Sequence, residues 1–193
     1  MRKRVSVVAV AAAFAALSAF AQTSAQQGAT STTKKAPTTK QFLTEAAQGS
    51  QAEIKMGQLA QQKGTTTQVK ELGARLVNDH TKLYDQIKQV ASSQNITVPE
   101  KPSAAQEKQI SRLESLSGEK FDRAFLLDQE RDHRRTMNLF QRETTNPNPQ
   151  VADLAKNAIP TLRTHMHLSQ QAMAALPPAK TPSTDNTGNP NQK

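Results

Sequence analysis

The chain has 193 residues and a formal net charge of +9, a length that suits one domain or two small ones. Aromatic residues make up only 4 % of it and Trp is absent, which excludes an aromatic-rich β-sandwich and an RNA-binding surface that stacks bases on aromatic rings. The absence of cysteine excludes disulfides, thiolate metal sites, cysteine nucleophiles and a lipid-anchored cysteine.

Residues 1–25 have the pattern of a secretory signal peptide. A basic start precedes an uncharged stretch of Ala, Val, Leu and Phe over residues 5–20, and small residues follow it. This stretch is shorter than the ~20 apolar residues that a membrane-spanning helix needs, which argues against a retained anchor. We therefore expect cleavage after Ala21 or Ala25. The mature protein would be periplasmic or secreted, with no transmembrane segment and a net charge of about +6.

Two segments of low complexity enclose the predicted domain. Residues 26–38 predict a flexible linker, and residues 177–193 predict a disordered tail rich in Pro and Asn, because neither has enough apolar surface to offset the entropy lost on ordering. The domain between them, residues 39–176, has 18 cationic and 15 anionic side chains. A net charge of +3 spread along helices indicates a solvated surface, so we expect no nucleic-acid partner.

Within the domain, apolar residues recur every three or four positions, which predicts amphipathic helices. The first helix begins near Thr38 or Thr39, either of which is a good N-cap, and it ends at Gly64. Thr65 is the predicted N-cap of the second helix, which runs toward the break at Pro99.

A short helix and two more long helices follow along the chain. Ser103 is the predicted N-cap of the short helix, and Gly118 is its predicted end. The third long helix is expected to end at Pro147 and Pro149, and the fourth covers residues 151–176.

The lengths of the connections predict how these helices pack. Short turns at 64–65 and 146–148 make two antiparallel hairpins, and the longer connection 95–117 joins them. The predicted fold class is therefore all-α, an up-down four-helix bundle with an extra short helix between helices 2 and 3. No strand is expected, because β-branched residues never alternate over four or more positions.

Each long helix has one ionisable residue on its apolar stripe near the midpoint: Glu53, His80, His133 and His165. Counted from the turns at 1.5 Å per residue, these residues lie at depths of ~17, ~23, ~21 and ~27 Å, within about one helical turn of the same level. Because an unpaired buried charge is costly, the four residues must either satisfy one another or hold a ligand.

Three imidazoles and a carboxylate match the preferences of Zn, Fe, Mn or Cu, and the cores of helical bundles often hold such ions. The metal hypothesis therefore names Glu53, His80, His133 and His165 as ligands. Two alternatives stay open: a hydrogen-bonded His/Glu network without metal, and core histidines that do not converge. His167 lies about 200° around the helix from His165, so it cannot share an ion with it and is expected to be exposed.

Three acidic residues close to the histidines carry weaker signals. Asp79 and Asp132 each precede a site histidine, so each would either orient a histidine or be a solvated surface acid. Glu130 and His133 have the Glu-x-x-His spacing of di-iron bundles, but the motif occurs once and that chemistry needs two. No catalytic residue and no site for an organic cofactor emerge from the sequence.

Motifs spread over all four long helices carry a family resemblance: Asp79-His80, Asp132-His133, Pro160-x-Leu162-x-x-His165, Phe42, Glu53, Leu59-Ala60 and Phe121-Asp122. In these residues the chain resembles the exported bacterial domain-of-unknown-function family four-one-four-two, which is often labelled "predicted outer membrane protein" and grouped with ferritin-like folds. The resemblance covers about residues 39–176. It implies a ferritin-like bundle and export, and it implies no established activity.

Three functions of different classes follow from these patterns. The first is an exported, non-enzymatic bundle protein that binds a divalent metal in its core and serves cell-envelope maintenance or stress tolerance. The second is a ferritin-like, metal-dependent redox enzyme, which needs an open coordination position on the ion. The third is a cationic module that binds anionic envelope polysaccharide or lipid.

Overall fold

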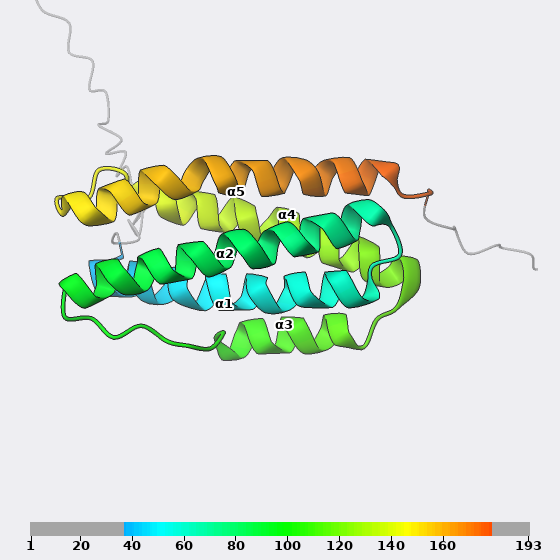
Figure 1. The fold of residues 1–193 in the computed structure, drawn as a ribbon, viewed down its shortest axis with the longest axis horizontal. Helices are drawn as coiled ribbons and strands as arrows, with labels where there is room; N and C mark the ends of the chain where they lie inside the picture. Colours follow the sequence, from blue (N-terminus) through cyan, green and yellow to red (C-terminus); the bar gives the residue numbers. More distant parts are fainter. Residues whose placement is uncertain (1–36, 179–193) are drawn as a thin grey trace, which may run out of the picture. The chain divides into compact units, whose positions relative to one another are not determined.

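The computed structural model describes residues 37–178, which form five α-helices and, within this range, no strand (Figure 1). The helices are α1 (Thr39–Lys63), α2 (Thr67–Ser93), α3 (Ala104–Glu114), α4 (Gly118–Glu143) and α5 (Pro149–Ala175). The predicted all-α fold, with four long helices and an extra short one between the second and third, is confirmed. The predicted signal peptide, the linker 26–38 and the tail 177–193 lie almost entirely outside the described residues.

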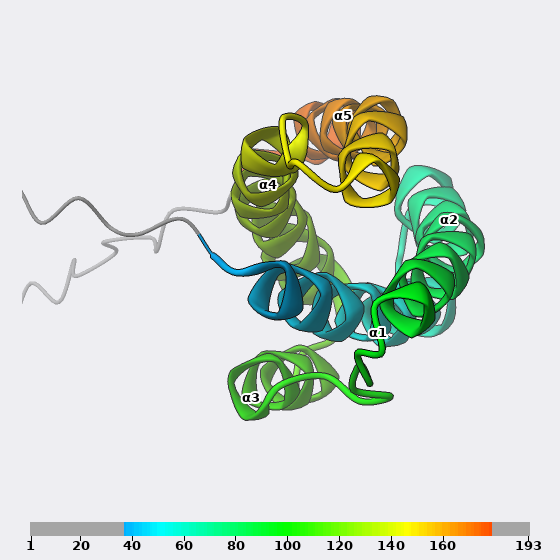
Figure 2. The ribbon, with the colours of Figure 1, turned by 90° about the vertical axis from the view of Figure 1, so that its left-hand side faces the viewer.

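The four long helices surround a common core, with α1 packed along α2 and α4 packed along α5 (Figure 2). The short helix α3 lies outside this group, against α1 and α4. It carries the chain back along the bundle, so α2 and α4 run in the same direction while every neighbouring pair of long helices is antiparallel (Figure 1). A bundle with one such crossover has the connectivity of ferritin-like folds.

Most of the helix caps follow the sequence, with a correction of one residue at α2. Thr38 and Ser103 form capping boxes at the starts of α1 and α3. Thr66, rather than the predicted Thr65, caps α2. The backbone N–H and the hydroxyl of Thr65 instead donate to the buried carboxylate of Asp122 in α4. This contact ties the α1–α2 turn to the N-terminal part of α4.

The ends of α3 and α4 also differ from the prediction. The short helix ends at Glu114, and Gly118 is the first residue of α4, where its φ of +61° lies in the left-handed region that glycine adopts at little cost. Likewise α4 ends at Glu143, before the two prolines. Pro149 starts α5, because the first turn of a helix does not use the N–H that proline lacks.

The buried apolar side chains form two clusters, one toward each end of the bundle. The first is centred on Phe42 and Phe140, whose rings lie 5.1 Å apart in an edge-to-face arrangement. The second is centred on the stacked rings of Phe121 and Phe125. The predicted site residues lie between the clusters, at the level where the apolar core is interrupted.

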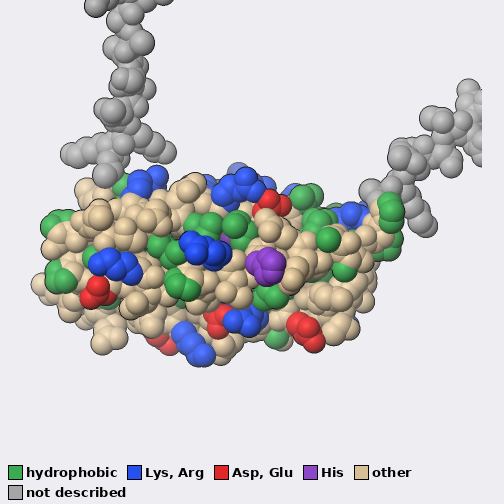
Figure 3. All heavy atoms as spheres, turned by 90° about the horizontal axis from the view of Figure 1, so that it is seen from above, with side chains coloured by type: hydrophobic (Ala, Val, Ile, Leu, Met, Phe, Trp, Pro, Cys, Tyr) green, Lys and Arg blue, Asp and Glu red, His purple; other side chains and the backbone are tan. Residues whose placement is uncertain are grey.

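On one face of the bundle, the side chains are mixed in character (Figure 3). Figure 3 shows lysine and arginine side chains interspersed with acidic and apolar ones on the face seen from above. Among residues 37–178, no helix is both long enough and apolar enough to span a bilayer.

Helices α1 and α2 approach each other most closely at two glycines. A Cβ atom added at Gly73 would lie 2.6 Å from the carbonyl oxygen of Gly57, and one added at Gly57 would lie 2.7 Å from the oxygen of Gly73. Both distances are shorter than real Cβ contacts, so any larger residue forces the two backbones apart. The glycines therefore set the spacing of the helix pair that carries His80.

We expect Gly73→Ala to lower the free energy of unfolding by about 1–3 kcal/mol, the usual cost of overpacking. This loss should appear even though alanine is the better helix former by about 1 kcal/mol. Gly49→Ala in α1 is the matched control, because an added Cβ there meets nothing within 4 Å. Urea denaturation should show the control unchanged or stabilised, and a Gly73 variant that is also stabilised would contradict the close approach.

Candidate metal centre

Three of the four predicted site residues converge in the middle of the bundle. His80 of α2, His133 of α4 and His165 of α5 are each at most 3 % exposed, and their ring centroids lie 5.2–5.6 Å apart. One nitrogen of each ring lies within 4.8 Å of the corresponding nitrogens of the other two. The apolar stripes of their helices turn all three residues inward, as the sequence spacing predicts.

Hydrogen bonds outside the cluster define where two of the rings carry their proton. Nδ1 of His133 lies 3.0 Å from the carbonyl oxygen of Gln129, one turn earlier on α4. A carbonyl only accepts, so this nitrogen is the donor and Nε2 has the free lone pair. Nε2 of His165 donates to the carboxylate of Asp79 across 2.9 Å, which leaves the lone pair of His165 on Nδ1.

These two lone pairs face each other. Nε2 of His133 and Nδ1 of His165 are 3.1 Å apart, and neither has a hydrogen to share when both rings are neutral. Only a proton or a cation between them turns the contact into an attraction. Two nitrogens at 2.0–2.1 Å from one tetrahedral ion are separated by about 3.3 Å, close to the spacing seen here.

A proton in that position would require a buried imidazolium, and burial disfavours it. Desolvation, together with neighbouring His165, lowers the pKa of His133 to about 3. Desolvation also lowers the pKa of His165, and its hydrogen bond to Asp79 opposes this only in part. The pKa of His80 is well below its ordinary value for the same first reason. All three rings are therefore neutral at neutral pH, the form that coordinates metal.

His80 has no hydrogen-bond partner for either ring nitrogen among the described residues, although it is only 3 % exposed. A buried polar group left unpaired costs about 1–3 kcal/mol, so such groups are uncommon without a ligand or a water. For His80 to join an ion held by the other two histidines, its nitrogen must move inward by up to about 1.5 Å.

Glu53, the fourth predicted ligand, lies on the opposite edge of His133. Its Oε1 is 3.9 Å from Nδ1 of His133, the nitrogen that already donates to Gln129, and its Oε2 accepts from the side-chain amide of Gln129. Burial raises the pKa of Glu53 to about 8, and the hydrogen bond from Gln129 only partly offsets this. The carboxyl group is therefore protonated at neutral pH and stands behind His133, outside the group of three lone pairs.

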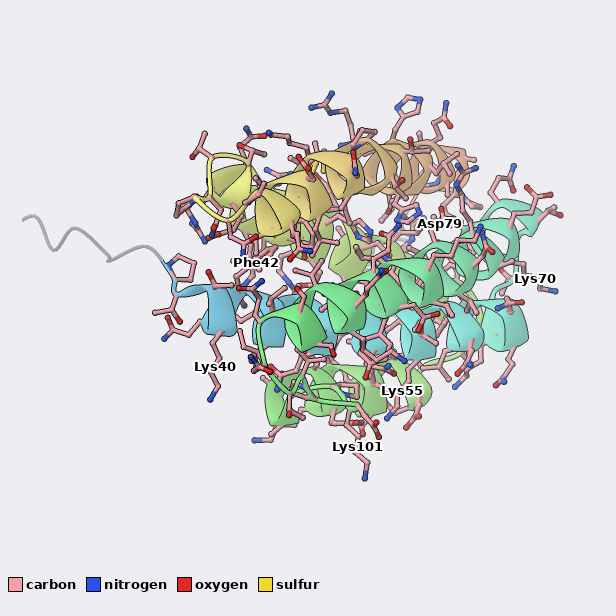
Figure 4. All side chains as sticks on the ribbon, turned by 60° about the vertical axis from the view of Figure 1, so that its left-hand side comes forward. Lys40, Phe42, Lys55, Lys70, Asp79 and Lys101 are labelled. Atoms are coloured by element: carbon pink, nitrogen blue, oxygen red, sulfur yellow. The ribbon has the colours of Figure 1, made fainter. Side chains whose placement is uncertain are left out.

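The two aspartates that precede histidines have different roles, a choice that the sequence left open. The Asp79 carboxylate, 17 % exposed, orients His165 and lies 3.4 Å from Nε of Arg75. Figure 4 shows Asp79 on the side of α2 that faces α5. Asp132 instead contacts Gln109 of α3 and Arg131, away from the histidines. His167 is exposed, as predicted.

The site also includes Gln129, which is neither a predicted ligand nor a predicted partner of one. Its carbonyl oxygen fixes the proton on His133, and its side chain holds Glu53. The sequence does contain a signal for Gln129, namely its position one turn before His133 on the apolar stripe of α4. A hydrogen bond from a ring to the carbonyl four residues earlier is a local contact that this spacing allows.

Two hollows lead to the histidines from opposite sides. The larger, about 170 Å³, lies between α2 and α5 and is lined at its base by His80 and His165. The smaller, about 20 Å³, lies between α1 and α4 and reaches Glu53, His80 and His133. The histidine cluster is thus buried beneath the surface and accessible from the α2–α5 side.

Comparison with known proteins identifies one family. The model of the family described as "Domain of unknown function (DUF4142)" matches residues 20–172, which is most of the chain. No curated protein and no solved structure gives a significant match. The matching family is the one that the sequence motifs indicated, and a ferritin-like bundle agrees with the all-helical structure.

Proposed function

The chain belongs to the DUF4142 family, and from its site we propose that it binds one transition-metal ion through His80, His133 and His165. The observation that carries this proposal is the 3.1 Å contact between two lone pairs whose ring protons are committed elsewhere. The unpartnered nitrogens of His80 beside that contact supply the third donor. Asp79 and the carbonyl of Gln129 hold two of the rings in the coordinating orientation, and the side chain of Gln129 also holds Glu53.

The donor set narrows the choice of ion. Three neutral imidazoles suit Zn, Cu, Fe and Ni, whereas Mn prefers carboxylate and water oxygens. With Glu53 behind His133 and Asp79 bonded to His165, none of the three donor atoms is an oxygen. The donor set therefore places Mn last, and the general affinity order of divalent first-row ions places Cu and Zn ahead of Fe.

The proposed setting of this protein is the cell envelope. The signal-peptide pattern of residues 1–25 supports export to the periplasm or beyond. Within that setting, the role we propose for the buried site is envelope maintenance or stress tolerance. A metal-dependent redox enzyme is the second candidate, and three protein ligands that leave a coordination position open favour it. On the face that Figure 3 shows, acidic side chains lie among the basic ones, so that face has no uniformly cationic patch for the cationic-module alternative.

The test is a thermal melt of the mature full-length protein with and without added Zn or Cu. An ion at one hundred times its dissociation constant adds about 2.7 kcal/mol to the free energy of unfolding, and a chelator should remove this gain. His165→Ala should abolish the response, whereas His167→Ala, on the exposed side of the same helix, should retain it. Elemental analysis of protein purified from the periplasm should report about one ion per chain.

The alternative hypothesis, a hydrogen-bonded His/Glu network without metal, predicts the opposite result in the same experiment. Each core substitution would still lower stability, by about 1–3 kcal/mol, but added metal and chelator would change nothing in any variant. That result would refute the proposed function.

A further inference from the structure

The hollow between α2 and α5 forms a route from solvent to the histidines. His80 and His165 are buried at its base, while Lys82 and Thr161 lie at the more exposed rim. Leu83 and Leu162 are buried apolar wall residues on opposite helices. Its volume of about 170 Å³ is similar to the engineered cavity of about 150 Å³ that accommodates benzene, so a molecule of about six heavy atoms fits.

The charges around this hollow favour an anion. Three neutral imidazoles leave the charge of a bound divalent ion intact, and among residues 37–178 Asp79 is the one acidic residue that lines the hollow. Arg75 beside Asp79 and Lys82 at the rim add positive charge. In a partly buried site of low dielectric constant, a small anion bound to the metal ion neutralises part of this excess positive charge at a short distance.

The shape of the hollow selects the kind of anion. Three protein ligands leave at least one position open on a tetrahedral ion. The hollow whose base includes His80 and His165 is the larger of the two openings that reach the histidines, so it is the route by which an external ligand would approach that position. Leu83 and Leu162, which line the hollow beside the polar Gln86 and Asn157, would cover a short hydrocarbon body better than water does. We infer that the metal ion keeps an exchangeable position on its α2–α5 side, and that the hollow admits a small organic carboxylate whose oxygen occupies it. This inference rests on the proposed function.

The test uses the full-length mature protein loaded with Co(II), whose visible absorption reports on its ligands. Azide probes the open position alone, and acetate, propionate and butyrate probe the apolar walls. All four should change the spectrum, and affinity should rise about fourfold per methylene along the carboxylate series, the ratio expected for burying one methylene. Thr161→Leu, which narrows the mouth, should weaken butyrate binding at least tenfold without altering cobalt uptake.

Thr164→Leu is the matched control. It makes the same substitution one turn further along α5, at a half-buried residue that does not line the hollow, and it should bind butyrate as the wild type does. A protein that takes up no cobalt overturns the proposed function and this inference together. A protein that takes up cobalt, but whose spectrum no anion changes, overturns the inference alone. Azide binding with no gain along the carboxylate series overturns the carboxylate assignment, and equal weakening in both threonine variants overturns the route.

Discussion

Replacing Glu53 by glutamine is expected to raise the free energy of unfolding of the metal-free protein at pH 7 by up to about 3 kcal/mol. Burial raises the pKa of Glu53 to about 8 from an ordinary value of 4.5, so the folded protein keeps a proton that the unfolded chain has released. Taking up that proton at pH 7 costs about 1.4 kcal/mol per pH unit above 4.5. Glutamine is uncharged in both states and keeps an oxygen that can accept from the Gln129 amide.

The pH dependence identifies the cause of this gain. Because the folded-state pKa of Glu53 is raised, its destabilising contribution is absent below about pH 4.5, grows as the pH rises and levels off above about pH 8. The histidines act in the opposite sense. Because burial lowers their pKa values, the unfolded chain takes up protons first as the pH falls below 6.5, and the free energy of unfolding decreases. Subtracting the wild-type stability from that of Glu53→Gln isolates the carboxyl group from the histidines.

Urea denaturation between pH 5.5 and 8, with a chelator present, measures this difference. It should grow by about 1.4 kcal/mol per pH unit up to pH 7. Glu45→Gln is the control, because Glu45 is exposed on the same helix two turns earlier and its substitution should give no such slope. A flat difference for Glu53→Gln would mean that the carboxyl group is ionised in the folded protein, and Glu53 would return as a candidate ligand.

The level of the site was predictable from the sequence. One of the four predicted site residues interrupts each apolar stripe near the midpoint of its helix, and the midpoints of helices of similar length lie near the same height whichever end is counted from. Helix α4 also buries three acidic residues that are not among the four, Asp122, Asp128 and Glu143. His80, His133 and His165 meet as that arithmetic suggests, because a buried stripe and a short turn leave a helix little freedom to slide. The same periodicity predicted the four long helices and the short one between the second and third.

The rise per residue gives the height of each residue, but it does not give the direction in which the residue points from its helix. Glu53 is on the buried stripe of α1, yet it meets the edge of His133 that points away from the other histidines. Asp79 lies about 100° from His80 on α2 and would be a surface acid, except that α5 brings His165 beside it. Thr65 likewise does not cap α2 as predicted, because it donates to Asp122, 57 residues further along the chain. These outcomes depend on which helices are neighbours, which local spacing does not determine.

Because Asp79 of α2 accepts a hydrogen bond from His165 of α5, substituting Asp79 should change the affinity of the site for metal. Asp79→Asn is expected to weaken Zn or Cu binding by 10- to 100-fold, the usual cost of removing a carboxylate that orients a histidine ligand. Asparagine can still accept a hydrogen bond from Nε2 of His165, but it lacks the negative charge that makes the opposite nitrogen a better donor to the ion. The stability of the metal-free protein should therefore change far less than the metal affinity.

Asp132→Asn is the matched control for this prediction, because Asp132 also precedes a site histidine but contacts Gln109 and Arg131 instead of the cluster. Competition with a chelator of known affinity should show wild-type metal binding for Asp132→Asn and weakened binding for Asp79→Asn. Urea denaturation of both metal-free variants separates a lost orienting contact from a general loss of packing. If the two substitutions weaken binding equally, or if Asp79→Asn binds as tightly as the wild type, then Asp79 does not act on the ion through His165, and the proton position on that ring must be assigned again.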